Sequence, residues 1–261
     1  MAHLVTLITD FGLREYFVGA IKGAMLSINP DLSIVDISHQ INSHDILEAA
    51  FTIRCAYSAF PPRTIHLVIV DPGVGSRRRA LIVATENYYF IGPDNGIFSL
   101  IYEAEPVQRV VSITSEHYFR RPVSRTFHGR DVFGPVAAWM ARGIEIGKFG
   151  EEISDYTKLT PPKPKKGADG KVQGIILHID KFGNLITNID QTALGKLGTP
   201  AKFTVAGKEV ASIVGSYAEG QPGEPFALVG SAGFYEISMQ KSSAAKALQA
   251  QRGAEVVVQL S

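Results

Sequence analysis

The sequence predicts two domains of different fold class: an N-terminal α/β domain with a mostly parallel sheet, and a small C-terminal antiparallel β-barrel domain. Up to about residue 158, short apolar β-branched runs alternate with longer segments of helical periodicity, which is typical of a sheet covered by helices. After residue 171, short strand-like runs are separated by Gly and Pro. A stretch rich in Pro, Lys and Gly, LTPPKPKKGADGK, separates the two patterns. We therefore expect domains over residues 1–160 and 172–261, joined by a linker over 161–171.

The first domain is predicted to alternate strands and helices along the chain. Apolar runs predict strands over 4–9, 33–37, 64–70, 80–85, 88–91 and 107–113, the fourth and fifth forming a hairpin. Helical periodicity predicts helices over 15–28, 43–59, 96–102 and 131–141. Ser43 is expected to cap the second helix, prolines at 30 and 61–62 to end the first two, and Gly143 to end the last.

The second domain is predicted to consist mainly of short strands. They lie over 173–179, 185–189, 202–205, 226–229, 234–237 and 255–260, with one short helix over 243–250. About 90 residues of this pattern fit a small antiparallel barrel or sandwich.

Composition excludes several classes of protein. The 261 residues carry 26 Lys plus Arg and 25 Asp plus Glu, so a net charge of +1 provides no field to hold a nucleic acid. The single cysteine, Cys55, excludes an internal disulfide and a cysteine-based zinc site. The sequence has no run of 18 apolar residues and no basic segment before an apolar one at its start, so we expect a cytoplasmic protein without contact to a membrane.

Three polar segments follow or precede predicted elements where ligands collect in α/β sheets. They are TDFG at 9–12, DPGVGS at 71–76 and FHGRD at 127–131. Asp10 ends an apolar strand and could bind a diol, an ammonium group or a metal, or could instead cap the next helix or close a turn with Gly12. Asp71 stands in the same relation to the third strand, and its PGVG continuation predicts a tight turn.

Three adjacent arginines follow that turn. Three adjacent arginines at such a junction usually form a solvated edge. Because side chains alternate along an extended segment, however, Arg78 is expected to point to the face opposite Arg77 and Arg79, so that one can turn inward while two stay solvated. His128 precedes a predicted helix, whose N-terminus would favour the neutral imidazole, although a purely structural histidine is equally compatible.

Other chemical signatures are weak. The glycines at 73 and 75 lack the third glycine of a dinucleotide loop, and the sequence contains no phosphate-binding Gly-Lys-Ser/Thr loop and no Gly-x-Ser-x-Gly elbow. Asp10, Asp71, His128 and Asp131 are possible hard metal ligands, but no His-x-His or Asp-x-Asp pair at ligand spacing supports a metallophosphatase. In the second domain, DKFGN at 180–184 is compatible with a simple hairpin turn. Tyr217 and Phe234 could stack on a heterocycle or belong to the core.

Five blocks together resemble one enzyme family. The blocks are ITDFG at 8–12, VDPGVGS followed by arginines at 70–78, GPDNG at 92–96, TFHGRDVFGP at 126–135 and IDKFGNLITNI at 179–189. They are similar to the S-adenosyl-L-methionine hydroxide adenosyltransferases, which are related to the fluorinases and chlorinases. The resemblance covers nearly the whole chain in order.

The resemblance implies a fold, an assembly and a reaction. The fold is an N-terminal α/β domain and a C-terminal β-barrel, assembled as a homotrimer with active sites between subunits. The reaction is attack of water or hydroxide on the ribose C5′ of S-adenosylmethionine, which gives adenosine and methionine without a cofactor or a metal. An Asp, Arg and His set positions the nucleophile, and by motif position these residues are Asp71, Arg78 and His128. Holding one water in line with the C5′–S bond could supply several kcal/mol of the roughly 7–11 available from orientation.

The resemblance also assigns substrate-binding residues. Asp10 matches the carboxylate that holds the ribose diol, Asp180 and Asn184 match residues that hold the methionine ammonium and the adenine edge, Ser231 matches a methionine-binding serine, and Tyr217 an adenine-stacking aromatic. Residues 237–241 depart from the family pattern, which leaves the backbone contacts to adenine open.

Two alternatives remain open at this point. Halogenating relatives differ at the Arg and His positions and the fluorinases carry an extra loop; this chain keeps both residues and has no long insertion between Asp71 and Asn95. The first alternative is nevertheless a halide-using adenosyltransferase, and the second is a nucleoside or S-adenosylmethionine binding protein without turnover.

Overall fold

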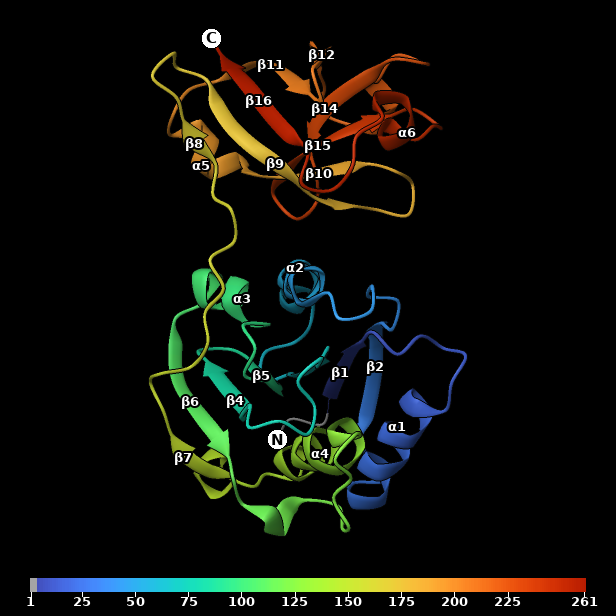
Figure 1. Ribbon diagram of the computed structural model, residues 1–261, viewed down its shortest axis with the longest axis vertical. Coiled ribbons are helices and arrows are strands. Elements are labelled where there is room, and N and C mark those ends of the chain that lie inside the picture. Colours follow the sequence, from blue (N-terminus) through green and yellow to red (C-terminus); the bar gives the residue numbers. More distant parts are fainter. Residues whose placement is uncertain (1–3) are drawn as a thin grey trace. The chain divides into compact units, whose positions relative to one another are not determined.

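The computed structural model describes residues 4–261 (Figure 1). The chain forms two compact units, Met1–Pro161 and Pro162–Ser261. Each unit has its own hydrophobic core, and each is described by itself. No helix within residues 4–261 is long and apolar enough to cross a bilayer.

The first unit is built on one seven-stranded sheet. In chain order its strands are β1 (Leu4–Thr9), β2 (Ser33–Ser38), β3 (Ile65–Ile69), β4 (Ala80–Thr85), β5 (Tyr89–Pro93), β6 (Val107–Ile113) and β7 (Gly150–Glu152). Their order across the sheet is β2-β1-β3-β5-β4-β6-β7. The first four are mutually parallel, whereas β4, β6 and β7 pair antiparallel. The expectation of a mostly parallel sheet was therefore wrong: the sheet is mixed, because the β4–β5 hairpin reverses the chain and β6 and β7 continue the antiparallel pairing.

Helices cover both faces of this sheet. They are α1 (Phe17–Ile28), α2 (Ile46–Ala56), α3 (Ser99–Ala104) and α4 (Gly134–Ala141). Side chains of β1 alternate between two cores: Val5 and Leu7 pack with α1 and α4, and Ile8 packs with α2 and α3. Accordingly, α1 and α4 lie on one side of the sheet and α2 and α3 on the other (Figure 1).

The register of β1 and β3 determines where the polar residues lie. The two strands pair in parallel from Val5 opposite Ile65 to Thr9 opposite Ile69. Asp10 follows β1 directly and Asp71 follows β3 after Val70, so both residues lie at the same edge of the sheet. This is the edge at which α/β sheets bind ligands.

Each helix of this unit begins two or three residues later than expected, and two of these differences have a local structural cause. Asp45, not Ser43, caps α2, and its carboxylate accepts from the Glu48 amide at 2.9 Å. His44 has a φ of 67°, which reverses the chain between Ser43 and the helix. The last helix is preceded by a π-helical segment, Gly129–Phe133, and begins at Gly134 instead of residue 131.

The second unit is a nearly closed, barrel-like sheet of nine strands. They are β8 (Lys165–Lys166), β9 (Val172–Ile179), β10 (Leu185–Asp190), β11 (Pro200–Val205), β12 (Lys208–Val210), β13 (Ser212–Ile213), β14 (Pro225–Val229), β15 (Phe234–Met239) and β16 (Glu255–Leu260). The order is β12-β11-β16-β9-β10-β15-β14-β13, with β8 beside β9 and every pair antiparallel except β13 with β14. The ends of the path approach one another, because β11 contacts β13 and β12 contacts β14. The six strands expected here are present, whereas β8, β12, β13 and the helix α5 (Gln191–Gly195) were not expected.

One helix of this unit was expected. It is α6 (Ala244–Leu248), capped by Ser243, whose hydroxyl accepts from the Lys246 amide at 3.2 Å.

Candidate active site

A carboxylate, a guanidinium and an imidazole from three separate segments meet in the first unit. Arg78 Nε lies 2.9 Å from Oδ1 and 3.0 Å from Oδ2 of Asp71, and Arg78 Nη2 also donates to Oδ2. The same Nη2 lies 2.9 Å from Nδ1 of His128. These three residues are the ones that the sequence resemblance selected, and the fold joins them into one continuous network.

The turn after β3 places Arg78 against Asp71. The Val74 amide donates to the Asp71 carbonyl at 3.2 Å, so the chain bends back immediately after the strand. Gly75 has a φ of 79°, and a Cβ there would lie 2.3 Å from the Arg125 carbonyl oxygen. Glycine is therefore required at this turn for both conformation and space.

The three adjacent arginines have three different environments. Arg77 is exposed, while the Arg78 side chain is only 11% exposed and contacts Asp71. Arg79 was expected to stay solvated, but it forms ion pairs with Asp94 and Asp155, each at 2.7 Å. The expectation that Arg78 points inward is confirmed. The expectation that Arg79 stays solvated was wrong, because two acidic residues from other parts of the chain bind it.

His128 is held in its neutral form. Burial and the neighbouring Arg78 charge lower its pKa below 6.5, and the Asp71 and Asp131 charges only partly oppose them. A guanidinium has donors and no acceptor, so Nδ1 must accept from Arg78 and the ring proton must sit on Nε2. The imidazole therefore retains one N–H donor for a further partner.

The Asp71–Arg78 pair is shielded from solvent. The two side chains are 6% and 11% exposed, and the Arg78 guanidinium lies 5.1 Å from the centre of the Phe133 ring. Such a doubly bonded pair in a shielded position keeps a fixed geometry.

Asp10 lies at the same sheet edge but does not cap a helix. The N-cap of α1 is Tyr16, which makes no side-chain capping bond. Instead, Asp10 Oδ2 accepts from the His44 amide at 2.9 Å, which ties the end of β1 to the loop before α2. The capping alternative was therefore wrong.

The second unit contains a cavity of about 730 Å³ that brings together three of the predicted residues of this unit. Asp180, Asn184 and Tyr217 line it together with Met239 and residues 240–243. Asp180 also makes the turn: Oδ1 accepts from the Phe182 and Asn184 amides and Oδ2 from Asn184 Nδ2, at 2.8–2.9 Å. Asp180 and Asn184 therefore belong both to the turn and to the cavity wall.

Two other candidates of this unit lie outside the cavity lining. Ser231 lies in the turn between β14 and β15, and Phe234 begins β15.

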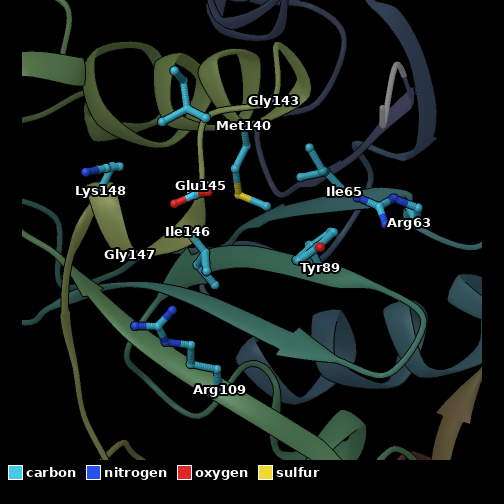
Figure 2. A pocket seen from close by; sticks show the side chains of 11 residues that line it. Arg63, Ile65, Tyr89, Arg109, Met140, Gly143, Glu145, Ile146, Gly147 and Lys148 are labelled. Carbon is cyan, nitrogen blue, oxygen red and sulfur yellow. The ribbon is translucent and has the colours of Figure 1, made fainter.

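Another cavity lies at the opposite edge of the first sheet. Its volume is about 620 Å³, and it is lined by Ile65 and Tyr89 at the beginnings of β3 and β5, by Arg63 and Arg109, and by residues 140 and 143–148. Figure 2 shows Arg63 and Lys148 at opposite ends of this cavity, with Met140 and Tyr89 between them. None of the predicted site residues belongs to it.

Several supporting residues were not predicted individually. Asn95 donates to the Val70 carbonyl at 2.9 Å and so fixes the end of β3 next to Asp71; the GPDNG block was its signal. Asp131 is fully buried, and its carboxylate accepts from Arg130 and from the Ser124 amide, so it holds the loop before α4 together. Within residues 4–261, no three His, Cys, Asp or Glu side chains are grouped as metal ligands would be.

Glu236 was also not predicted. This acidic residue is buried in β15, and its carboxylate accepts from the Tyr217 hydroxyl.

Comparisons with known proteins match both units of the chain to the same family. Residues 5–150 match the N-terminal domain and residues 174–257 the C-terminal domain of the SAM hydroxide adenosyltransferases. The chain is 40% identical over 191 residues to the (R)-S-adenosyl-L-methionine hydrolase of Methanocaldococcus jannaschii, an alignment that covers 71% of this chain and 66% of that enzyme. It is 32% identical over 260 residues to the enzyme of the same name from Thermus thermophilus, covering 97% and 98%. A fluorinase from an Actinoplanes species is 25% identical, with 98% and 97% covered.

Two solved structures have a similar fold over nearly the whole chain. An uncharacterized conserved protein from Thermotoga maritima has a TM-score of 0.92 and 32% identity, covering 97% of this chain and 99% of that one. A conserved hypothetical protein from Thermus thermophilus has a TM-score of 0.81 and 30% identity, covering 99% and 100%. The two domain matches together account for most of the chain, and the chain therefore belongs to the SAM hydroxide adenosyltransferase family.

Proposed function

We infer that this protein is an enzyme that hydrolyses S-adenosyl-L-methionine to adenosine and L-methionine. Water attacks the ribose C5′, the new O–C5′ bond forms as the C5′–S bond breaks, and the sulfur leaves with the bonding electron pair as the thioether of methionine. The proton of the attacking water passes to a base and then to solvent. The observation that carries this function is the Asp71–Arg78–His128 network, in a chain whose relatives are named (R)-S-adenosyl-L-methionine hydrolases.

The network supports a role in positioning and activating the water. Asp71 is the acceptor for the water's hydrogen, because it is the only one of the three that carries negative charge. Arg78 keeps that carboxylate in one orientation through two donors. Neutral His128 supplies the Nε2–H donor that orients the water's oxygen. We propose no cofactor and no metal, because the sulfonium is already a good leaving group and the barrier falls mainly through orientation.

The remaining residues divide between ribose, base and amino acid. Asp10 holds the ribose diol, for which one carboxylate oxygen already accepts from His44 and the other remains for a hydroxyl. In the second unit, Asp180 binds the methionine ammonium, Asn184 the adenine edge, and Tyr217 stacks on adenine; all three line one cavity. Ser231 contacts the methionine portion.

We further propose a cytoplasmic homotrimer with active sites between subunits. Asp71, Arg78 and His128 belong to the first unit, and the cavity residues belong to the second. In the proposed assembly, each active site combines the first unit of one copy with the second unit of another. Complementation tests this assembly. Asp71→Asn and Asp180→Ala variants, each inactive alone, should regain activity when they are unfolded and refolded together, because some sites then combine two intact halves. A mixture that stays inactive would contradict sharing between copies.

The names of the relatives specify the R configuration at sulfur. We propose the R sulfonium epimer as the preferred substrate, which separate assays of the two epimers test by their kcat/KM ratio.

A product assay tests the reaction and separates it from its alternatives. The protein is incubated with S-adenosylmethionine without halide, with chloride and with fluoride, and the nucleoside products are separated by chromatography. Hydrolysis predicts adenosine at the same rate in all three. A 5′-halo product identifies a halide-using transferase, and substrate that is retained unchanged identifies a binding protein without turnover.

A further inference from the structure

A buried carboxylate lies behind the wall of the cavity in the second unit. Glu236 is 6% exposed and sits in β15, where it pairs with Leu228 of β14 and Ile186 of β10. Its donors are neutral hydroxyls, and no cationic side chain within residues 4–261 forms an ion pair with it. A buried acid of this kind is costly unless its oxygens are bound, so its contacts indicate its purpose.

One oxygen of Glu236 holds the cavity wall. Oε1 accepts from the hydroxyl of Tyr217, which lines the cavity, and from Ser238 Oγ at 3.4 Å. Burial and the Glu236 hydrogen bond both raise the pKa of Tyr217, so its hydroxyl stays protonated and remains a donor at neutral pH.

The other oxygen faces the turn that carries Ser231. A Cβ at Gly230 would lie 2.6 Å from Glu236 Oε2, so glycine is needed there to leave room for the carboxylate. The turn is closed by the Gly230 amide, which donates to the Phe234 carbonyl, and by the Gly233 amide, which donates to the Gly230 carbonyl, both at 2.9 Å. Glu236 therefore lies between Tyr217 and the turn of Ser231.

Tyr217 needs an anchor of this kind. The residue is 49% exposed and belongs to a single 3-10 turn, Tyr217–Glu219, that follows the two-residue strand β13. A half-exposed ring on such a short element can rotate between side-chain rotamers unless its far end is bound.

We propose that Glu236 is a positioning residue for substrate binding, which holds the Tyr217 ring in the orientation that stacks on a planar heterocyclic ligand. The inference rests on the proposed function for the identity of that ligand, a purine nucleoside. Glu236 acts through Tyr217 and does not touch the reacting atoms.

A double-mutant cycle on adenosine binding tests this role. Calorimetry gives the adenosine Kd of the wild type, Glu236→Ala, Tyr217→Phe and the double variant, and steady-state assays give KM and kcat. Loss of one hydrogen bond predicts a Kd and a KM raised about tenfold in each single variant, with kcat within about twofold. The double variant should be no weaker than the single ones, because both changes remove the same bond. Glu236→Gln keeps an acceptor of the same shape and should restore binding to within about threefold of the wild type.

The controls separate positioning from general stability. Glu224→Ala removes an exposed acid of the same unit and should leave Kd and KM unchanged. Additive effects in the double variant, or an unchanged Kd in both Glu236→Ala and Tyr217→Phe, would overturn the proposal. If Glu236→Ala does not fold, the adenosine Kd values of Tyr217→Phe and Glu236→Gln test the proposal alone. A Kd raised about tenfold in Tyr217→Phe, and within about threefold of the wild type in Glu236→Gln, supports it. A wild type that binds adenosine but does not consume S-adenosylmethionine refutes the proposed function and leaves this test valid.

Discussion

Arg78 and His128 are joined by a contact that can have only one polarity. Arg78 Nη2 lies 2.9 Å from His128 Nδ1, and because the guanidinium cannot accept, the imidazole does. The contact thus fixes both the charge and the tautomer of His128. The same guanidinium binds Asp71, so one side chain holds both of the groups that we propose to face the nucleophile.

Replacing Arg78 should cost far more activity than replacing its neighbour. Arg78→Ala removes the bonds to Asp71 and His128 and should lower kcat/KM by about 100-fold or more. Arg77→Ala removes an exposed side chain and should stay within about twofold of the wild type. Steady-state rates of adenosine formation measure both. Equal losses would mean that Arg78 has no special position.

Removing the charge of Asp71 should abolish turnover and spare binding. Asp71→Asn keeps the shape of the side chain but is a much weaker proton acceptor, so kcat should fall by about 10²- to 10⁴-fold. The affinity for substrate, measured by calorimetry on the slow variant, should change little. A variant with the wild-type kcat would remove Asp71 from the mechanism.

The rate should fall in acid as His128 takes up a proton. Its pKa is lowered below 6.5, so His128 is neutral at pH 7 and kcat/KM should decline only at pH values below 6.5. Protonated His128 can no longer accept from Arg78. His128→Asn provides an acceptor that does not titrate, and its slower reaction should lack this part of the acid decline. An identical pH profile in the variant would assign the decline to another group.

The buried His66 should make the fold sensitive to acid. Burial lowers its pKa from 6.5 to about 3, and its Nδ1 lies 2.7 Å from Thr6 Oγ1. Between these two pH values the unfolded chain binds a proton that the folded chain does not. The free energy of unfolding therefore falls with decreasing pH, by up to about 1.4 kcal/mol per pH unit from this group.

Substitution isolates that contribution. His66→Gln should show a shallower loss of stability between pH 6.5 and 3 than the wild type in urea unfolding, whatever its stability at pH 7. His117→Gln, at an exposed position, should keep the wild-type slope. Parallel slopes for wild type and His66→Gln would show that His66 is protonated in the folded state.

Long apolar runs and alternation predicted the main elements and the inward arginine. The buried strands β1, β3 and β4 are apolar runs that need no context, and alternation placed Arg78 on the face opposite Arg77, while the resemblance assigned it to the site. The direction of pairing in β6 and β7 was not predictable in this way, because it depends on the hairpin before them and not on their own residues. Strands of two or three residues, such as β8 and β13, show no periodicity at all.

The residues that the sequence did not predict correctly have different causes. Glu236 lies in a strand in which every residue from Tyr235 to Ser238 is buried, so alternation does not reveal which face it occupies. Asp45 replaces Ser43 as a cap because His44 adopts a left-handed conformation, which no local pattern announces. Arg79 was expected to be solvated, but it binds Asp155, which lies 76 positions further along the chain. Of these three cases, a contact between distant segments decides that of Arg79.

Isotope labelling of the product tests attack at C5′ most directly. The wild type and Asp71→Asn are incubated with S-adenosylmethionine in water enriched in ¹⁸O, and the products are examined by mass spectrometry. Adenosine should carry one ¹⁸O at its 5′-hydroxyl, methionine should carry none, and Asp71→Asn should form little of either. Unlabelled adenosine, or substrate that remains unconsumed by the wild type, would contradict hydrolysis by a water held at Asp71.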